Sequence, residues 1–368
     1  MARLAAGVRR KGNLFEKRFT FEGKRYSVYA PTQKELANKE HELREQLKSK
    51  QYVSNRNITL DAYFKEWISA KEKSTKSTSI YTYETLYYKR ISPKLGKRKI
   101  KDIERREITS FQKELAAELK PNTVNYVIDE LANILNGAII DNIIIKNPCY
   151  GVKHIKETEK ATETIHRALT MEEQAAFMEE LKDSFYYEFI AFMLCTGTRC
   201  GEAAALTWGD IDEKNGVIHI TKTTTYSKGG VLEVGKTTKT KAGKRDIPLM
   251  PNSQKVLKRQ QNKIKGILNL PNKRIFCTYN GDLIRSYAIN KEIDNTLKRL
   301  EEKGMHIERF TSHALRDTFA TRFIEQGGTL QTLKTILGHE SYNMTADLYA
   351  HVLPNTKKEE MERINIVI

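Results

Sequence analysis

Hydrophobic and polar positions follow three different patterns along the 368-residue chain. Near the start, NLFEKRFTF and KRYSVYA are rich in aromatic and β-branched residues on either side of Gly23, which predicts two strands joined by a turn. Thr32 then precedes QKELANKEHELREQLKSK, where leucines recur at helical spacing, so a capped helix is expected. The first part of the chain therefore predicts a small sheet with one helix.

The second pattern is helical and covers residues 57–150. Apolar residues recur at helical spacing in TLDAYFKEWISAKEK. The next helix, STSIYTYETLYYKRISPKLG, is expected to stop at Pro93 and Gly96, and EITSFQKELAAEL forms a third. Pro121 opens a long fourth helix, a position that favours proline. The polar segments QYVSNRN and KNPCYGVKHIKETEKATET mark the limits of this region.

From about residue 165 the pattern is mixed. LTMEEQAAFMEELK begins with Thr170 and Glu173 at the spacing of a capping box. An apolar helix, FYYEFIAFMLCT, ends at Gly197, and another begins near Cys200. GVIHITKTTTYSKGGVLEV and RDIPL read as strands, and helices return toward the C-terminus.

These patterns predict a multidomain α+β fold. A small β-sheet-plus-helix domain is expected at residues 1–52 and an all-helical domain at residues 57–150. A mixed, mainly helical domain with a small antiparallel sheet is expected at residues 165–368.

The net charge of the chain indicates which class of partner it binds. The net charge is +17, and the first 50 residues alone carry 13 Lys and Arg against six Asp and Glu. This balance favours a polyanionic partner, and nucleic acid is the first candidate, although like charge also keeps a basic protein soluble.

The four cysteines form no CxxC pair and have no zinc-ligand spacing, so reduced thiols are expected. No apolar run reaches a membrane span and no secretory signal is apparent, so a cytoplasmic location is expected.

Residues suited to phosphoryl transfer lie beside predicted helix caps and turns: Arg199, His313, Arg316, His339 and Tyr349. Arginines can clamp the charge of a phosphodiester transition state, histidines can move protons, and a tyrosine can attack. No carboxylate cluster suggests a two-metal site, and no Gly-rich phosphate loop ends in Lys-Ser/Thr. Each residue taken alone is more often structural, but the set favours covalent transfer through tyrosine without metal or cofactor.

Four motifs in order, TGTRCGE, HALRDTFAT, LGHES and ADLYAHV, resemble those of tyrosine recombinases, the phage-type integrases. The basic N-terminus resembles the arm-type DNA-binding domain of integrases from integrative and conjugative elements, and the helical region resembles their core-binding domain. The resemblance implies that Arg199 and Arg316 clamp the scissile phosphate. It implies that His313 assists proton transfer and that His339 binds the same phosphate. Tyr349 would attack and leave a 3′-phosphotyrosine and a free 5′-hydroxyl.

The resemblance also implies a lysine general acid on a β-hairpin, within TTKTKAGKRDIPL. Lys239 fits best by its distance from the Ile-Pro pair, and Lys241 and Lys236 remain open. Glu202 matches an acidic residue that supports the first arginine in this family.

The function expected from the resemblance is site-specific recombination that integrates and excises a mobile element through a Holliday junction. The expected partners are double-stranded DNA at core and arm attachment sites, a homo-tetramer on that DNA, an excisionase-type directionality factor and a host DNA-bending protein. The expected location is the bacterial cytoplasm, with the nucleoid.

The alternatives are a type IB topoisomerase, which shares the tyrosine chemistry, and a catalytically inactive DNA-binding protein. The apolar C-terminal INIVI is expected to pack on a neighbouring protomer, with docking on its own domain left open.

Overall fold

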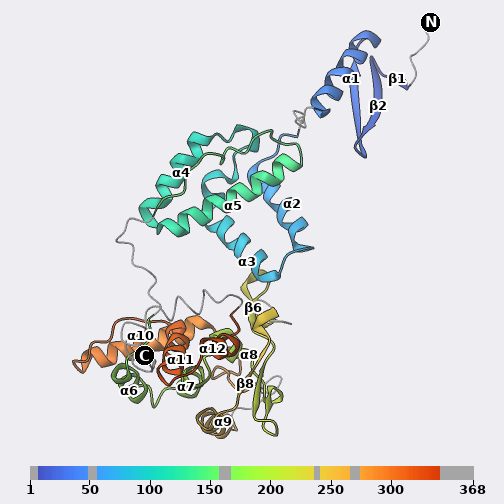
Figure 1. The fold of residues 1–368 in the computed structure, drawn as a ribbon. Coiled ribbons are helices and arrows are strands. Elements are labelled where there is room, and N and C mark those ends of the chain that lie inside the picture. The colour runs from blue at the N-terminus through green and yellow to red at the C-terminus, as the bar shows by residue number, and fades with distance from the viewer. Residues whose placement is uncertain (1–6, 49–55, 157–166, 236–240, 266–273, 340–368) are drawn as a thin grey trace, which may run out of the picture. The chain divides into compact units, whose positions relative to one another are not determined.

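The structure is a computed structural model that describes residues 7–48, 56–156, 167–235, 241–265 and 274–339. The chain divides into two compact units, Met1–Ala161 and Thr162–Ile368. Figure 1 follows the chain from the first helices and strands to the last. Within the described residues, every helix is too short or too polar to cross a membrane.

The first unit begins with a three-stranded antiparallel sheet and a helix: β1 (Val8–Lys11), β2 (Leu14–Phe21), β3 (Lys24–Ala30) and α1 (Gln33–Lys48). The two predicted strands are confirmed. β1 was not predicted because VRRK shows no apolar alternation. Thr32 caps α1 as predicted, since its Oγ1 accepts the Glu35 N–H at 3.2 Å. A small core built on Phe19, Val28 and Leu36 packs α1 against one face of the sheet, so the opposite face carries the polar residues.

The remainder of the first unit is helical: α2 (Leu60–Glu72), α3 (Ser77–Leu86), the π-helical η1 (Tyr87–Gly96), η2 (Ile100–Asp102), α4 (Arg105–Glu118) and α5 (Pro121–Ile140). Pro121 occupies the start of α5 as predicted. The helical run ends at Gly96 as predicted, but the prediction that Pro93 also stops it is wrong, because the backbone stays helical through Pro93. The wider turn of a π-helix relaxes the contact between the proline ring and the preceding carbonyl that would break an α-helix.

The second unit contains α6 (Met171–Glu180), α7 (Tyr187–Thr196), α8 (Cys200–Ala205), η3 (Trp208–Asp210), β4 (Ile211–Asp212), β5 (Val217–Ile220), β6 (Thr224–Tyr226), η4 (Lys228–Gly230), β7 (Leu232–Val234), η5 (Lys241–Gly243), β8 (Arg245–Pro248), α9 (Pro251–Ile264), α10 (Ser286–Glu302), α11 (Ser312–Glu325) and α12 (Leu330–Leu337). Strands β4, β5 and β8 form one antiparallel sheet, and β6 pairs with β7. The predicted capping box of α6 is confirmed, since Thr170 and Glu173 each accept the other's backbone N–H.

The apolar helix predicted before Gly197 is α7, and it packs against both α9 and α11. Phe189 and Phe192 on this helix are buried in the main core of the unit. The expected α+β fold, mainly helical with small antiparallel sheets, is confirmed. The division at 1–52, 57–150 and 165–368 stays a prediction, although the first unit holds two hydrophobic cores with no residue in common.

Two glycines end helices that matter for the site. Gly197 follows α7 with φ 62° and Gly338 follows α12 with φ 66°, both in the left-handed region. A side chain at Gly197 would also collide with the Phe319 ring of α11, and one at Gly338 would lie 2.7 Å from the Ala242 carbonyl oxygen. Both positions therefore require glycine for backbone conformation and for space.

We predict that Gly197→Ala lowers the free energy of unfolding of the second unit by roughly 2–4 kcal/mol, because left-handed strain and the Phe319 collision add. Gly304→Ala is the matched control, with φ 81° and nothing within 4 Å of the added carbon. It should cost only about 1–2 kcal/mol. Urea unfolding followed by Trp208 fluorescence in a Trp67→Phe background measures both. Equal losses in the two variants would show that the Phe319 contact relaxes.

Candidate active site

The structure describes four of the six predicted catalytic residues. Arg199 lies at the N-terminus of α8, His313 and Arg316 lie on α11, and His339 directly follows Gly338. Lys239 and Tyr349 lie outside the described residues, as do Lys236 and the C-terminal tail. The side chain of Lys241 is also outside the described part.

Arg316 joins three helices. Its side chain is buried, and its two terminal nitrogens donate to carbonyl oxygens at the ends of two other helices. Nη1 donates to Gly197 O at 2.7 Å and Nη2 to Leu337 O at 2.6 Å. The last carbonyls of a helix lack intrahelical partners and carry partial negative charge, so a guanidinium is well placed between two such ends. Gly197 and Leu337 each lie two residues before a predicted catalytic residue, Arg199 and His339. The two hydrogen bonds therefore hold both segments against the same side chain.

Burial, together with the positive charge of Arg199, lowers the pKa of the Arg316 guanidinium to about 9, so Arg316 remains charged at neutral pH. The two predicted clamp residues are therefore close enough to repel each other. An anion bound between them would relieve that repulsion. The Arg199 side chain is 35% exposed, so an anion from solvent can reach it.

Glu202 holds Arg199 in place. Its carboxylate accepts the Arg199 backbone N–H at 2.9 Å and the Arg199 Nη1 at 2.9 Å, which fixes both the backbone and the side chain of that residue. The same carboxylate accepts Arg245 Nη2 at 2.8 Å. Burial would raise the pKa of the Glu202 carboxyl, but the hydrogen bond and charge of Arg245, with help from Arg199, hold this pKa below its usual range.

Arg245 is a site residue that the sequence reasoning missed. Its side chain is 3% exposed and it donates to Glu202, to Ile336 O and to Gly243 O. It thus connects β8 to α8 and to the end of α12. The sequence did contain a signal: alternation along RDIPL places Arg245 on the same face as the buried Ile247.

His313 and His339 are placed differently. His313 is exposed in the first turn of α11, one turn before Arg316, whereas His339 is half-buried after the glycine cap of α12. The His339 N–H donates to Lys334 O at 3.2 Å, which closes the C-terminal turn of α12. The backbone position of His339 is therefore set by the helix end that Arg316 and Arg245 hold.

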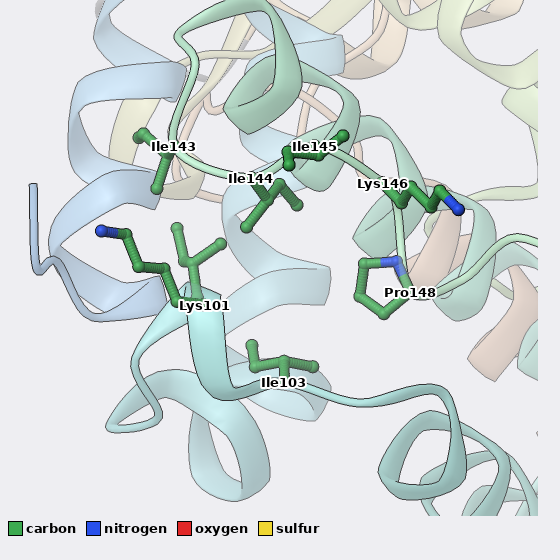
Figure 2. A pocket seen from close by; sticks show the side chains of 8 residues that line it. Lys101, Ile103, Ile143, Ile144, Ile145, Lys146 and Pro148 are labelled. Atoms are coloured by element: carbon green, nitrogen blue, oxygen red, sulfur yellow. The ribbon is translucent and has the colours of Figure 1, made fainter. Parts of the chain in front are cut away.

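A pocket in the first unit is a separate feature. Figure 2 shows isoleucine side chains from the segment after α5 and from around η2, with Pro148 beside them. Among the described residues, Lys101 and Lys146 are the charged residues that line it. The rest of its described lining is isoleucine and proline, so it is an apolar surface apart from the candidate site.

Comparison with known proteins gives a family and a fold. The model of the phage integrase family matches residues 167–356, more than half of the chain, and that of the phage integrase N-terminal SAM-like domain matches residues 59–116. The ICEBs1 integrase of Bacillus subtilis is 27% identical over 340 residues, covering 91% of this chain and 90% of that protein.

Solved structures share the fold. A Tn1549 transposon integrase in complex with a circular intermediate DNA matches with a TM-score of 0.68 and 22% identity, covering 84% of this chain and 100% of that one. A lambda integrase tetramer bound to a Holliday junction matches with a TM-score of 0.59 and 17% identity, covering 95% of this chain and 96% of that one.

We predict that Glu202→Gln lowers the free energy of unfolding of the second unit by roughly 3–5 kcal/mol, because it leaves the Arg245 charge buried without its partner. Glu179→Gln, in an exposed pair with Lys182, is the control and should cost less than about 1 kcal/mol. The pKa of Glu202 is depressed by folding, so the wild-type advantage should persist at neutral pH and shrink as the pH falls below the ordinary glutamate range. A loss for Glu202→Gln as small as that of the control would contradict this account.

Proposed function

Because the chain belongs to the phage integrase family, we propose that it is a site-specific DNA recombinase that integrates and excises a mobile genetic element. One observation carries the proposal: Arg316 on α11 is hydrogen-bonded to the helix ends that precede Arg199 and His339. This arrangement gathers three separate sequence motifs around the place where a phosphodiester would bind.

The proposed reaction is covalent phosphoryl transfer. The Tyr349 oxygen forms a bond to the scissile phosphorus, and the bond from phosphorus to the 5′-oxygen breaks. Arg199 and Arg316 bind the non-bridging oxygens, where negative charge grows in the transition state. His339 hydrogen-bonds the same phosphate, and His313 assists proton transfer.

Lys239 completes the cleavage step by giving a proton to the departing 5′-oxygen, with Lys241 and Lys236 as the alternatives. The energy of the broken bond is kept in the phosphotyrosine, so a 5′-hydroxyl from a second duplex can attack it without ATP. Exchange of one strand from each duplex gives a Holliday junction, and a second round of cleavage and religation resolves it.

The proposed assembly is a homo-tetramer on double-stranded DNA. Support comes from the lambda integrase tetramer bound to a Holliday junction, which shares the fold over 95% of this chain. Residues 1–52 bind arm sites and residues 57–150 bind core sites, in the bacterial cytoplasm with the nucleoid. The C-terminal tail docks on a neighbouring protomer, and an excisionase-type factor and a host DNA-bending protein set direction and bend the DNA.

A type IB topoisomerase is the second candidate function, because the chemistry of one cleavage step is the same. A duplex with a nick near the cleavage site traps the covalent adduct, since the short strand that carries the 5′-hydroxyl diffuses away. Formation of the covalent adduct excludes the reading as an inactive DNA-binding protein. Joining of strands from two different duplexes excludes a topoisomerase, which cuts and rejoins the strand of a single duplex.

We predict that Tyr349→Phe abolishes the covalent adduct, with a fall of about a thousand-fold or more, while DNA affinity stays nearly unchanged. The change removes one oxygen and little packing. Tyr342→Phe is the matched control in the same segment and should retain adduct formation. Denaturing gel analysis of a labelled nicked duplex measures both, and loss of adduct in the Tyr342 variant alone would overturn the assignment.

The general acid can be assigned by changing the leaving group. Lys239→Met should slow cleavage about 10²- to 10⁴-fold on normal DNA. A duplex with sulfur in place of the 5′-bridging oxygen should restore the rate, because a thiol has a pKa of about 8.5 and leaves without protonation. Lys241→Met and Lys236→Met should be slowed little on either duplex. Rescue of one of these variants in place of Lys239→Met would move the role to that lysine.

A further inference from the structure

The open face of the N-terminal sheet carries an unusual arrangement of charge. The register places Arg9 opposite Glu16 on the neighbouring strand, and Glu16 opposite Tyr29 on the next. Arg18 lies two residues beyond Glu16, on the same face. Helix α1 packs against the other face, with the small core built on Phe19. A carboxylate thus lies on this face beside two arginines and a tyrosine.

Three donors converge on this carboxylate. Arg9 Nε donates to Oε2 of Glu16, Arg18 Nε donates to Oε1 at 3.0 Å, and the Tyr29 hydroxyl donates to Oε1 at 2.7 Å. The Glu16 side chain is fully covered, whereas the side chains of Arg9 and Arg18 are 55% and 58% exposed. Glu16 lies on the face away from the core, in contact with the three side chains that donate to it.

Stability alone gives a weak reason for this arrangement. Ion pairs with solvent-exposed arginines contribute little to folding, and glutamate has a low preference for strands. The hydrogen bond from Arg9, followed by those from Tyr29 and Arg18, lowers the pKa of Glu16 to about 2. The carboxylate is therefore ionised at neutral pH, where both arginines can stay hydrogen-bonded to it.

The engaged atoms leave the outer end of each arginine available to a ligand. A guanidinium that uses its Nε–H on a carboxylate still has two terminal nitrogens, and these can hydrogen-bond O6 and N7 of guanine. The major groove of DNA is wide enough to admit a pair of β-strands. Fixing a long side chain before binding also removes part of the entropy cost of reading a base.

We propose that Glu16 is a positioning residue that holds Arg9 and Arg18 so that they read guanines in the major groove of DNA. This inference rests on the proposed function, in which residues 1–52 bind arm sites. Lys11 and Arg25 lie on the same face and supply contacts to phosphates, which add affinity without sequence preference. Sequence preference therefore depends on a carboxylate that itself repels DNA.

The test uses the full-length protein and a pool of duplexes with 20 randomised base pairs, a length of roughly two helical turns. Selection defines the bases preferred by the wild type and by each variant. The double variant Arg9→Ala/Arg18→Ala identifies the positions read by this face. Affinity for an unselected pool gives the binding that is independent of sequence, and circular dichroism with thermal unfolding checks the fold.

Glu16→Gln should lose the guanine preference at those same positions by about ten-fold or more. Its affinity for the unselected pool should stay the same or rise, because one negative charge is removed. Glu22→Gln, in the exposed turn between β2 and β3, makes the same change of charge and should keep the preference. A merely structural role would instead weaken specific and unselected binding together.

Three results would overturn the proposal or its basis. Retained guanine preference in Glu16→Gln means that the carboxylate positions nothing. An unchanged motif in the double arginine variant means that this face reads no bases. If deletion of residues 1–52 leaves the selected motif and recombination unchanged, arm binding itself fails, which is a distinct outcome.

Discussion

The buried guanidinium of Arg316 is the interaction on which the geometry of the catalytic unit depends. It donates to the backbone carbonyls at the C-terminal ends of α7 and α12, so one side chain on α11 fixes two other helix ends. Each of those helices ends at a glycine in the left-handed conformation. The glycine turns the chain away sharply, so that Arg199 and His339 follow almost at once. The predicted catalytic residues are thus positioned by helix ends, where carbonyls already attract a cation.

Hydrogen bonds of Glu202 and Arg245 reinforce the arrangement held by Arg316. Glu202 fixes Arg199, and Arg245 joins Glu202 to the carbonyl of Ile336 in α12. The arginines are therefore oriented before any substrate binds, and little reorganisation is needed as charge develops. Preorganisation has a cost, because like charges are held close together with one of them buried. In the proposed reaction, the bound phosphodiester supplies the negative charge that this arrangement lacks.

The helix ends beside Arg199 and His339 could be predicted from the sequence because the glycines that end those helices are local signals. The glycine after α7, the capping box of α6 and each of the four motifs lie in short stretches of chain. The pairing of Arg245 with Glu202 joins residues 43 positions apart, so no local pattern reveals it. The burial of Glu16 likewise depends on cross-strand register, and β1 was not predicted. Pro93 was misjudged because a rule for α-helices was applied to a π-helical turn.

The most direct test of the account is whether Arg199 acts by neutralising phosphate charge. Single-turnover cleavage is measured for the wild type and Arg199→Ala on two nicked duplexes, one normal and one with an uncharged methylphosphonate at the cleavage site. Arg199→Ala should be slowed on the normal duplex by about 10²-fold or more and should recover most of that loss on the neutral one. An equal loss on both duplexes would contradict this role, because Arg199 would then act without binding the phosphate charge.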